Sequence, residues 1–214
     1  QKGPTAPPEI DMKVTVLGIG LMGYPMARRL AQAGFEVHAW NRTLAKAQRL
    51  TRNGVHVHAL APDAVHQADI VLTMLDDGAV VERVLFEGGV AAAMARGSMV
   101  VDMSSIRPIE ARDHAARLSE LHIDYLDAPV SGGTIGAEAG TLAIMVGGKA
   151  TVFDRALPLL QALGHPKHVG PTGAGQLAKL ANQMIVGATI GAVAEALLLC
   201  ERGGANMAKV REAI

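Results

Sequence analysis

The chain has 214 residues, of which 50% are hydrophobic, and its 20 basic and 20 acidic residues give a formal net charge of zero. This length allows one large domain, or one domain and part of a second, with ample apolar material for a core. A neutral chain with 3% aromatic residues lacks the basic surface and stacking side chains of nucleic-acid-binding proteins, so we expect no nucleic-acid partner. The single cysteine, Cys200, indicates a structural role in a reducing compartment.

The first twelve residues differ in composition from the rest of the chain. They hold three of the ten prolines and no periodic pattern, so residues 1–12 are interpreted as a disordered tail or an added remnant. No basic region followed by an apolar stretch occurs there, which favours a cytoplasmic location. The most apolar stretch, residues 184–200, carries Glu195 and is too short to cross a bilayer. It predicts a buried helix and no membrane partner.

Strand-like and helix-like segments alternate from residue 13 to residue 172. Strands are expected at 13–17, 36–40, 56–58, 70–74, 99–101 and 125–126, and helices at 22–32, 44–53, 62–67, 77–85 and 108–121. A strand at 141–146, a helix at 149–163 and a short strand at 167–169 follow. This alternation predicts a doubly wound, Rossmann-type α/β domain over residues 13–172, built on a parallel sheet.

Residues 173–214 form a different kind of segment. Residues 174–202 contain no proline and only three glycines, which predicts one long interdomain helix that ends at Gly203-Gly204. A second helical pattern begins at Asn206 and runs to Ile214. A further domain or a partner subunit is expected to cover the apolar side of the long helix.

The expected first strand is followed directly by Gly18-Ile19-Gly20-Leu21-Met22-Gly23. At this spacing the first glycine permits a tight turn, the second lets the backbone approach a pyrophosphate, and the third seats the helix on the sheet. A glycine-rich turn without a ligand is the alternative. Because strand, turn, helix and second strand follow in order, the pattern favours a bound dinucleotide with its phosphates at the helix N-terminus.

Asn41-Arg42-Thr43 follows the second expected strand, 18 positions after Gly23. An acidic residue there would accept hydrogen bonds from the ribose 2′-hydroxyl of NAD. Arg42 instead suits a 2′-phosphate, with Asn41 and Thr43 as neutral donors. We therefore predict NADP as the cofactor, with NADPH preferred over NADH.

Polar residues follow three later strands, where ligands of open α/β sheets bind. They are Leu75-Asp76-Asp77, Ser104-Ser105 and the segment that ends in Ser131-Gly132-Gly133. The hydroxyl and the backbone N–H groups of this last tripeptide can hold a carboxylate, although an ordinary turn is equally consistent. The adjacent acids Asp76 and Asp77 favour a cap of the next helix over a catalytic carboxylate pair, so hydrolytic chemistry is not supported.

Lys179 lies about one turn into the long helix, with Asn182 and Gln183 three and four positions further along the same face. A hydride that reaches a carbonyl carbon creates an alkoxide, and a lysine whose pKa is lowered by partial burial can protonate it. A solvated lysine on a helix surface is the alternative. The two amides on its face favour the catalytic interpretation, with Asn182 and Gln183 as substrate contacts.

His56 and His58 lie on one face of an expected strand. A metal site would need a third ligand, and no Cys, Asp or Glu close in the sequence completes one. We therefore predict no metal site and interpret these histidines as structural or exposed.

Four stretches together resemble the β-hydroxyacid dehydrogenase family, which includes 3-hydroxyisobutyrate dehydrogenase, tartronate semialdehyde reductase and, more distantly, 6-phosphogluconate dehydrogenase. They are residues 18–27, Asp102-Met103-Ser104-Ser105-Ile106, residues 127–143, and the segment from Gly173 to Gln183, in family order. The resemblance implies that Lys179 is the catalytic lysine and that Ser131, Gly132 and Gly133 bind the substrate carboxylate. It also implies that Asn182 orients the substrate and that Leu75, Asp76 and Ser105 lie along the cofactor. It further implies an all-helical C-terminal domain, of which residues 173–214 hold only the start, and a homodimer or homotetramer.

The chain departs from the family where Asp76 replaces a frequent Pro and Ser105 a frequent Thr. The expected function is an NADP(H)-dependent oxidoreductase that interconverts a small 3-hydroxy acid and its β-aldehyde or keto acid. An imine reductase-like enzyme is one alternative, although imine reductases generally replace the lysine. A non-catalytic dinucleotide-binding module is the other.

Overall fold

The computed structural model describes residues 10–214. Residues 1–9 of the expected tail lie outside the described residues, whereas residues 10–12 belong to the first strand, β1 (Ile10–Leu17). The chain forms two compact units, one that ends at Lys179 and one that comprises residues 180–214. They divide inside the long helix α9 (Ala174–Arg202), whereas the boundary expected at 172/173 precedes it.

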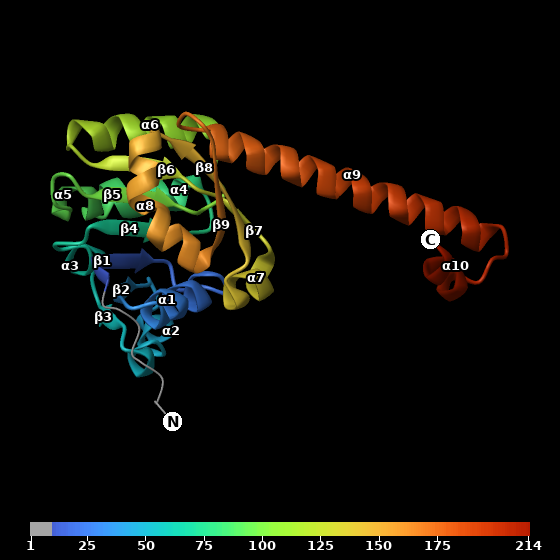
Figure 1. The fold of residues 1–214 in the computed structure, drawn as a ribbon, viewed down its shortest axis with the longest axis horizontal. Helices are drawn as coiled ribbons and strands as arrows, with labels where there is room; N and C mark the ends of the chain where they lie inside the picture. The colour runs from blue at the N-terminus through green and yellow to red at the C-terminus, as the bar shows by residue number, and fades with distance from the viewer. Residues whose placement is uncertain (1–9) are drawn as a thin grey trace, which may run out of the picture. The chain divides into compact units, whose positions relative to one another are not determined.

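Nine strands of the described chain form one sheet in the order β3-β2-β1-β4-β5-β6-β8-β7, with β9 beside β8 (Figure 1). From β1 to β6 the strands are parallel, and β1 lies between β2 and β4. The remaining strands are β2 (Phe35–Trp40), β3 (His56–His58), β4 (Ile70–Thr73), β5 (Met99–Asp102), β6 (Asp124–Asp127), β7 (Val130–Ser131), β8 (Leu142–Gly148) and β9 (Gly164–Gly170). The chain therefore reverses direction across the sheet at β1, and ligands of doubly wound folds bind at such a reversal.

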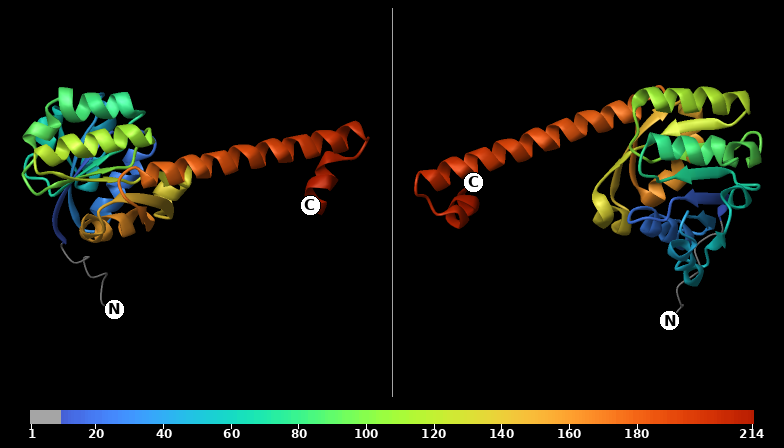
Figure 2. Two further views of the ribbon diagram at one scale, coloured as in Figure 1. Left: turned by 90° about the horizontal axis from the view of Figure 1, so that it is seen from above. Right: turned by 180° about the vertical axis from the view of Figure 1, so that it is seen from behind.

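Helices cover both faces of this sheet (Figure 2). In the first unit they are α1 (Gly23–Gln32), α2 (Leu44–Gln48), α3 (Ala61–Ala64), α4 (Gly78–Glu82), α5 (Val90–Ala93), α6 (Pro108–Glu120), α7 (Gly133–Ala139) and α8 (Ala150–Leu163). A 3-10 turn, Thr51–Asn53, and a π-helical turn, Arg83–Glu87, add to them. The doubly wound α/β prediction is confirmed.

The far edge of the sheet differs from the all-parallel expectation. β8 runs antiparallel to both β6 and β7, and the segment from Val130 to Ala139 forms a short strand and helix that the pattern did not predict. The helix α7 contains two glycines, which are poor helix formers. Tertiary packing compensates, because Gly136 lies against the side chain of Leu142, where a larger residue would be crowded.

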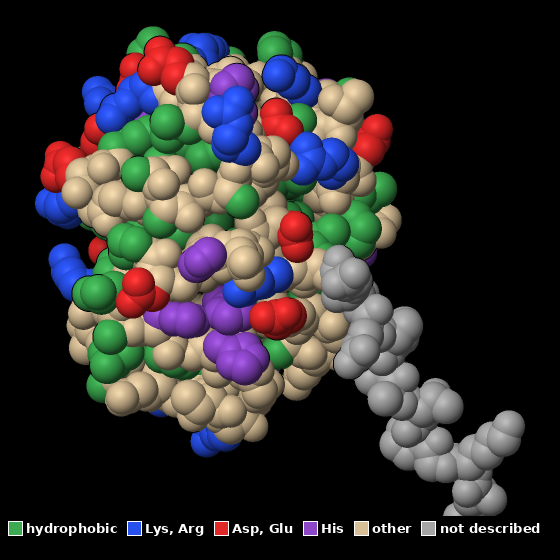
Figure 3. Space-filling view, turned by 90° about the vertical axis from the view of Figure 1, so that its left-hand side faces the viewer, with side chains coloured by type: hydrophobic (Ala, Val, Ile, Leu, Met, Phe, Trp, Pro, Cys, Tyr) green, Lys and Arg blue, Asp and Glu red, His purple; other side chains and the backbone are tan. Residues whose placement is uncertain are grey.

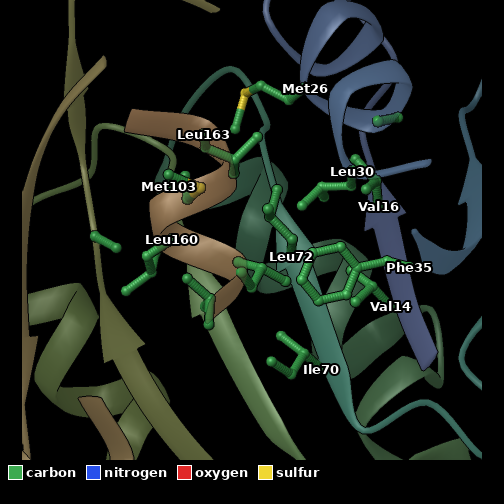
Figure 4. Packing of buried hydrophobic residues seen from close by; sticks show 14 of the residues in the cluster. Val14, Val16, Met26, Leu30, Phe35, Ile70, Leu72, Met103, Leu160 and Leu163 are labelled. Atoms are coloured by element: carbon green, nitrogen blue, oxygen red, sulfur yellow. The ribbon is translucent and has the colours of Figure 1, made fainter. Parts of the chain in front are cut away.

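Two apolar clusters make up the core, one on each face of the sheet. Successive side chains of a strand point to opposite faces, so Ile70 and Leu72 join one cluster while Val71 joins the other. The first cluster packs α1 and α8 on the sheet through residues such as Leu30 and Leu160 (Figure 4). Because the central strands are covered on both sides, they read as continuous apolar runs.

The second unit contains the C-terminal part of α9 and the helix α10 (Met207–Ala213). The prediction that residues 184–200 are buried is wrong for this chain, since Met184 is 75% exposed and Leu199 equally so. The expectation that this apolar stretch is too short to cross a bilayer is also wrong. By length and composition alone α9 could span a membrane, a test that core helices of many globular proteins also pass.

Candidate coenzyme and substrate site

The glycine turn after β1 is shaped by close backbone contacts. Gly18 has φ +103°, and a side chain there would collide with the carbonyl oxygen of Met74. A side chain at Gly23 would collide with the carbonyl oxygen of Gly18, so the third glycine packs against the turn itself as α1 begins. A side chain at Gly20 would meet no atom within 4 Å. Open space therefore remains in front of the second glycine, as a backbone contact to pyrophosphate requires.

The N-terminus of α1 is suited to an anion. No side chain caps its first turn, and that turn contains no acidic residue. The first N–H groups of a helix lack intrahelical partners and carry partial positive charge. In α1 the N–H of Tyr24 already donates to the carbonyl oxygen of Gly20 (3.1 Å) and Pro25 has no N–H, so donors to a phosphate group come from the backbone that precedes Tyr24.

Asn41 joins the turns that follow β1 and β2. Its Oδ1 accepts a hydrogen bond from the N–H of Ile19 (2.9 Å), and its Nδ2 donates to the carbonyl oxygen of Thr43 (3.0 Å). Both polar atoms of the Asn41 side chain thus hold the loop together. Of the three residues predicted to face a 2′-phosphate, Arg42 and Thr43 have exposed side chains, and these side chains form no hydrogen bond with another residue of the described chain.

A cavity of about 430 Å³ lies at the carboxyl ends of β1, β2 and β4, and we call it the β1/β4 cavity. Three cationic side chains line it: Arg42, Lys46 and Arg83. The described residues provide no ion-pair partner for any of the three, and Asp76 is the acid among the lining residues. The β1/β4 cavity therefore fits a ligand with several negative charges.

Most of the predicted coenzyme contacts meet at this cavity. Seven of them line it, namely Gly18, Gly20, Asn41, Arg42, Thr43, Leu75 and Asp76. Five others lie outside its lining, namely Ile19, Leu21, Met22, Gly23 and Ser105. Sequence reasoning missed Lys46 and Arg83. The four-residue spacing from Arg42 could have indicated Lys46, whereas Arg83 comes from a π-helical turn that only the tertiary structure places here.

Trp40, at the end of β2, is the single tryptophan of the sequence and also lines the β1/β4 cavity. Its indole Nε1 donates a hydrogen bond to the carbonyl oxygen of Ala59 (3.2 Å). The ring is therefore fixed at the wall of the cavity. Its fluorescence can report on a ligand that binds there.

The loop after β5 is tied to β4. The Oγ of Ser104 accepts a hydrogen bond from the N–H of Leu75 (3.0 Å), and its own N–H donates to Asp102 Oδ1 (3.0 Å). Ser104 is buried and Ser105 is exposed. Of this serine pair, Ser105 is thus the one accessible to a ligand, and its contact to the coenzyme remains a prediction.

Asp77 caps α4, because its Oδ1 accepts the N–H of Val80 (2.8 Å). The interpretation of Asp77 as a cap is confirmed.

Ser131-Gly132-Gly133 forms the junction between β7 and α7, where Gly132 has φ +130° and Gly133 φ +60°. Only glycine adopts such angles without strain. Both glycines are exposed, so a ligand can approach this backbone, and the carboxylate site remains a prediction.

Lys179 is half-buried, and burial lowers the pKa of its ammonium group below the ordinary value of 10.5. The direction matches the prediction from sequence. The first unit of the chain ends at Lys179. Asn182 and Gln183 belong to the second unit, where Asn182 is half-exposed and Gln183 is exposed. Their contacts to a substrate remain predictions.

Two buried carboxyl groups stand side by side at the ends of β5 and β6, where Asp102 pairs with Asp127 in register. Asp102 accepts hydrogen bonds from the hydroxyls of Thr73 (2.8 Å) and Tyr125 (3.1 Å). Asp127 accepts backbone N–H groups from the start of α9. Burial raises the pKa of both carboxyls. Sequence reasoning did not assign them a role.

A histidine cluster, consisting of His38, His56 and His58, covers the β2–β3 edge of the sheet beside acidic and basic side chains (Figure 3). His38 contacts His58 (Nδ1 to Nε2, 2.7 Å) and Glu36 (Nε2 to Oε1, 2.9 Å). Burial lowers the pKa of His38 and of His58. Within residues 10–214, no group of three His, Cys, Asp or Glu residues is arranged to hold a metal ion.

Comparison with known families gives two matches along the chain. Residues 13–191 match the NAD-binding domain of 6-phosphogluconate dehydrogenase. Residues 173–214 match the NAD-binding region of NADP-dependent 3-hydroxyisobutyrate dehydrogenase. The first match alone spans more than half of the chain.

Individual relatives agree with these matches. The chain is 46% identical over 205 residues to 2-hydroxy-3-oxopropionate reductase of Escherichia coli (strain K12), which covers 95% of this chain and 70% of that protein. It resembles the structure of Mycobacterium tuberculosis 3-hydroxyisobutyrate dehydrogenase with L-serine (TM-score 0.88, 39% identity, 92% of this chain and 67% of that one). It also resembles an imine reductase variant from Myxococcus stipitatus in complex with NAD+ (TM-score 0.89, 25% identity, 96% of this chain and 71% of that one).

Proposed function

The chain belongs to the β-hydroxyacid dehydrogenase family of NAD(P)-dependent dehydrogenases and reductases, and we propose that it interconverts a small 3-hydroxy acid and its β-aldehyde or keto acid. The proposed coenzyme is NADP(H). The proposed proton donor and acceptor is Lys179. Support comes from a relative with 46% identity whose name describes the reduction of a three-carbon oxo acid.

The preference for NADPH over NADH rests on the charges of the β1/β4 cavity. Arg42 and Lys46 follow β2, the strand at whose end NAD-specific sites carry an acid for the ribose 2′-hydroxyl. Because neither cation has an ion-pair partner within residues 10–214, both are available to a 2′-phosphate. The pyrophosphate would lie against Gly20 and the N-terminus of α1, where the backbone is open.

NADPH, when bound, supplies a hydride to the carbonyl carbon of the substrate. Negative charge then develops on the carbonyl oxygen, and the Lys179 ammonium stabilises it and donates a proton from Nζ. In the oxidative direction the neutral amine accepts the hydroxyl proton. Partial burial favours this exchange, because it lowers the pKa of Lys179 toward neutrality.

The remaining predicted residues bind and orient the substrate. Ser131, Gly132 and Gly133 are proposed to hold its carboxylate through a hydroxyl and exposed backbone N–H groups. Asn182 and Gln183 are proposed to orient the reacting carbon. Leu75, Asp76 and Ser105 are proposed to line the coenzyme.

The observation that carries this proposal is the half-buried Lys179 on a helix whose first turn is hydrogen-bonded to the carboxyl end of β6. The test measures oxidation of NADPH by 2-hydroxy-3-oxopropionate in the wild type and in Lys179→Ala. Lys149→Ala, a change of an exposed lysine before α8, is the control. Loss of turnover in Lys179→Ala alone supports the proposal, and full turnover in that variant refutes it.

The imine reductase resemblance defines a second assay. A cyclic imine replaces the oxo acid under the same conditions, and turnover of the imine but not of the acid would favour that chemistry. Quenching of Trp40 by NADPH without turnover of either substrate would favour a dinucleotide-binding module.

A further inference from the structure

The first turn of α9 is held by groups that take no direct part in the proposed reaction. The carboxylate of Asp127 accepts the backbone N–H groups of Gly173 (2.8 Å) and Gln176 (2.9 Å). Gly175 lies so close to the carbonyl oxygens of Met145 and Asp127 that a side chain there would collide with them. The position at which α9 begins is therefore determined by β6 and β8.

The side chain of Gln176 continues this attachment. It is 1% exposed, and both atoms of its amide are used. Its Oε1 accepts a hydrogen bond from the N–H of Ile106 (3.1 Å), and its Nε2 donates to the carbonyl oxygen of Ser104 (2.9 Å). These two backbone groups flank Ser105. The amide thus bridges the loop that presents the exposed Ser105 hydroxyl.

Lys179 follows Gln176 by three positions on α9. Residues at this spacing are neighbours on one face of a helix, so Lys179 shares the face that Gln176 presents to the loop after β5. The partial burial of Lys179 agrees with this placement. One buried amide therefore connects the loop of a predicted coenzyme contact with the helix face of the predicted proton donor.

We propose that Gln176 is a positioning residue, which sets where the Lys179 amine lies relative to coenzyme bound beside Ser105. This inference rests on the proposed function, in which Lys179 is the proton donor and acceptor. The site requires one donor and one acceptor on the same side chain, at a fixed separation. An amide supplies both without a charge, whereas a carboxylate supplies acceptors only.

The experiment compares Gln176→Met and Gln176→Glu with Gln161→Met, a matched change at an exposed glutamine of α8. NADPH binding is followed by quenching of Trp40. The ionisation of Lys179 is followed without turnover, by labelling with acetic anhydride across a pH series and mass spectrometry of its peptide. Turnover of 2-hydroxy-3-oxopropionate gives kcat and KM.

In Gln176→Met we expect the labelling curve of Lys179 to move toward that of an exposed lysine. We expect kcat to fall roughly 10- to 100-fold, because small displacements of reacting groups are costly, while KM for NADPH changes less than about threefold. Gln161→Met keeps wild-type values in all three measurements. An unchanged labelling curve and an unchanged kcat in a folded Gln176→Met protein overturn the proposal.

Gln176→Glu keeps the test decisive if the methionine variant does not fold. A protonated carboxyl restores one donor and one acceptor, so its kcat relative to wild type rises as the pH falls. An equal loss at every pH contradicts the positioning role. If the wild type shows no turnover but the labelling curve of Lys179 still differs between the wild type and the Gln176 variants, the proposed reaction is refuted and the positioning of the amine is supported.

Discussion

Replacement of Arg42 by alanine tests how the β1/β4 cavity distinguishes its coenzymes. Arg42 is exposed and has no ion-pair partner among the described residues, so the substitution breaks no ion pair of the folded chain. Its effect should therefore fall on the bound state alone. A hydrogen bond to a charged group contributes about 1.5–3 kcal/mol, which corresponds to a ~10- to ~150-fold loss of NADPH affinity.

NADH lacks the 2′-phosphate, so its affinity should change less than about twofold in Arg42→Ala. Lys46 remains at the cavity and keeps part of the NADPH preference, which places the expected loss toward the lower end of the range. The NADPH affinity of the wild type should also fall with added salt more steeply than that of Arg42→Ala, because the variant makes one charged contact fewer.

The assay is a titration of Trp40 fluorescence with each coenzyme at fixed ionic strength. Arg96→Ala, at an exposed arginine outside the cavity lining, serves as the control, and Trp40→Phe verifies the origin of the signal. Equal losses for NADPH and NADH would show that Arg42 binds a feature that both share. No loss for either would remove Arg42 from the site.

Three further changes test the glycine turn, the core and the histidine cluster. Gly20→Ala should weaken NADPH binding, as measured by Trp40 quenching, without lowering the melting temperature. Gly18→Ala should lower both the NADPH affinity and the melting temperature, because its side chain meets the Met74 carbonyl. Leu72→Ala, fully buried, should reduce the free energy of unfolding in urea by about 2–5 kcal/mol; a loss below about 1 kcal/mol would contradict its place in the core. Folding lowers the pKa values of His38 and His58, so near and below pH 6.5 the unfolded chain binds more protons than the folded one. The free energy of unfolding should therefore fall as the pH drops through and below 6.5. The slope of this fall should be smaller in His58→Gln. A pH-independent free energy between pH 7.5 and 5.5 would contradict this explanation.

Local patterns in the sequence were sufficient for the central sheet and its ligand end. The apolar runs in β4 and β5 reflect a sheet covered on both faces, and the Gly18, Gly20 and Gly23 spacing after an apolar strand is a local pattern typical of a dinucleotide-binding turn. The long helix was also predicted with its observed bounds, because the absence of proline is a local property.

Other features arose from contacts between residues far apart in the chain. The antiparallel edge at β7 and β8 and the glycine-containing α7 are stabilised by packing, which overrides weak local preference. Arg83 reaches the β1/β4 cavity only because β4 lies beside β1, and the Gln176 amide meets residues about 70 positions earlier.

The sequence by itself thus determined which segments fold and which end of the sheet carries polar side chains, since both follow from periodicity and turn chemistry. Only the tertiary structure decided which side chains hold others in place. Asn41, Asp127 and Gln176 are polar residues whose sequence patterns do not distinguish a ligand contact from a structural bond. Burial decides between these roles, because a polar group removed from water must find a partner within the fold.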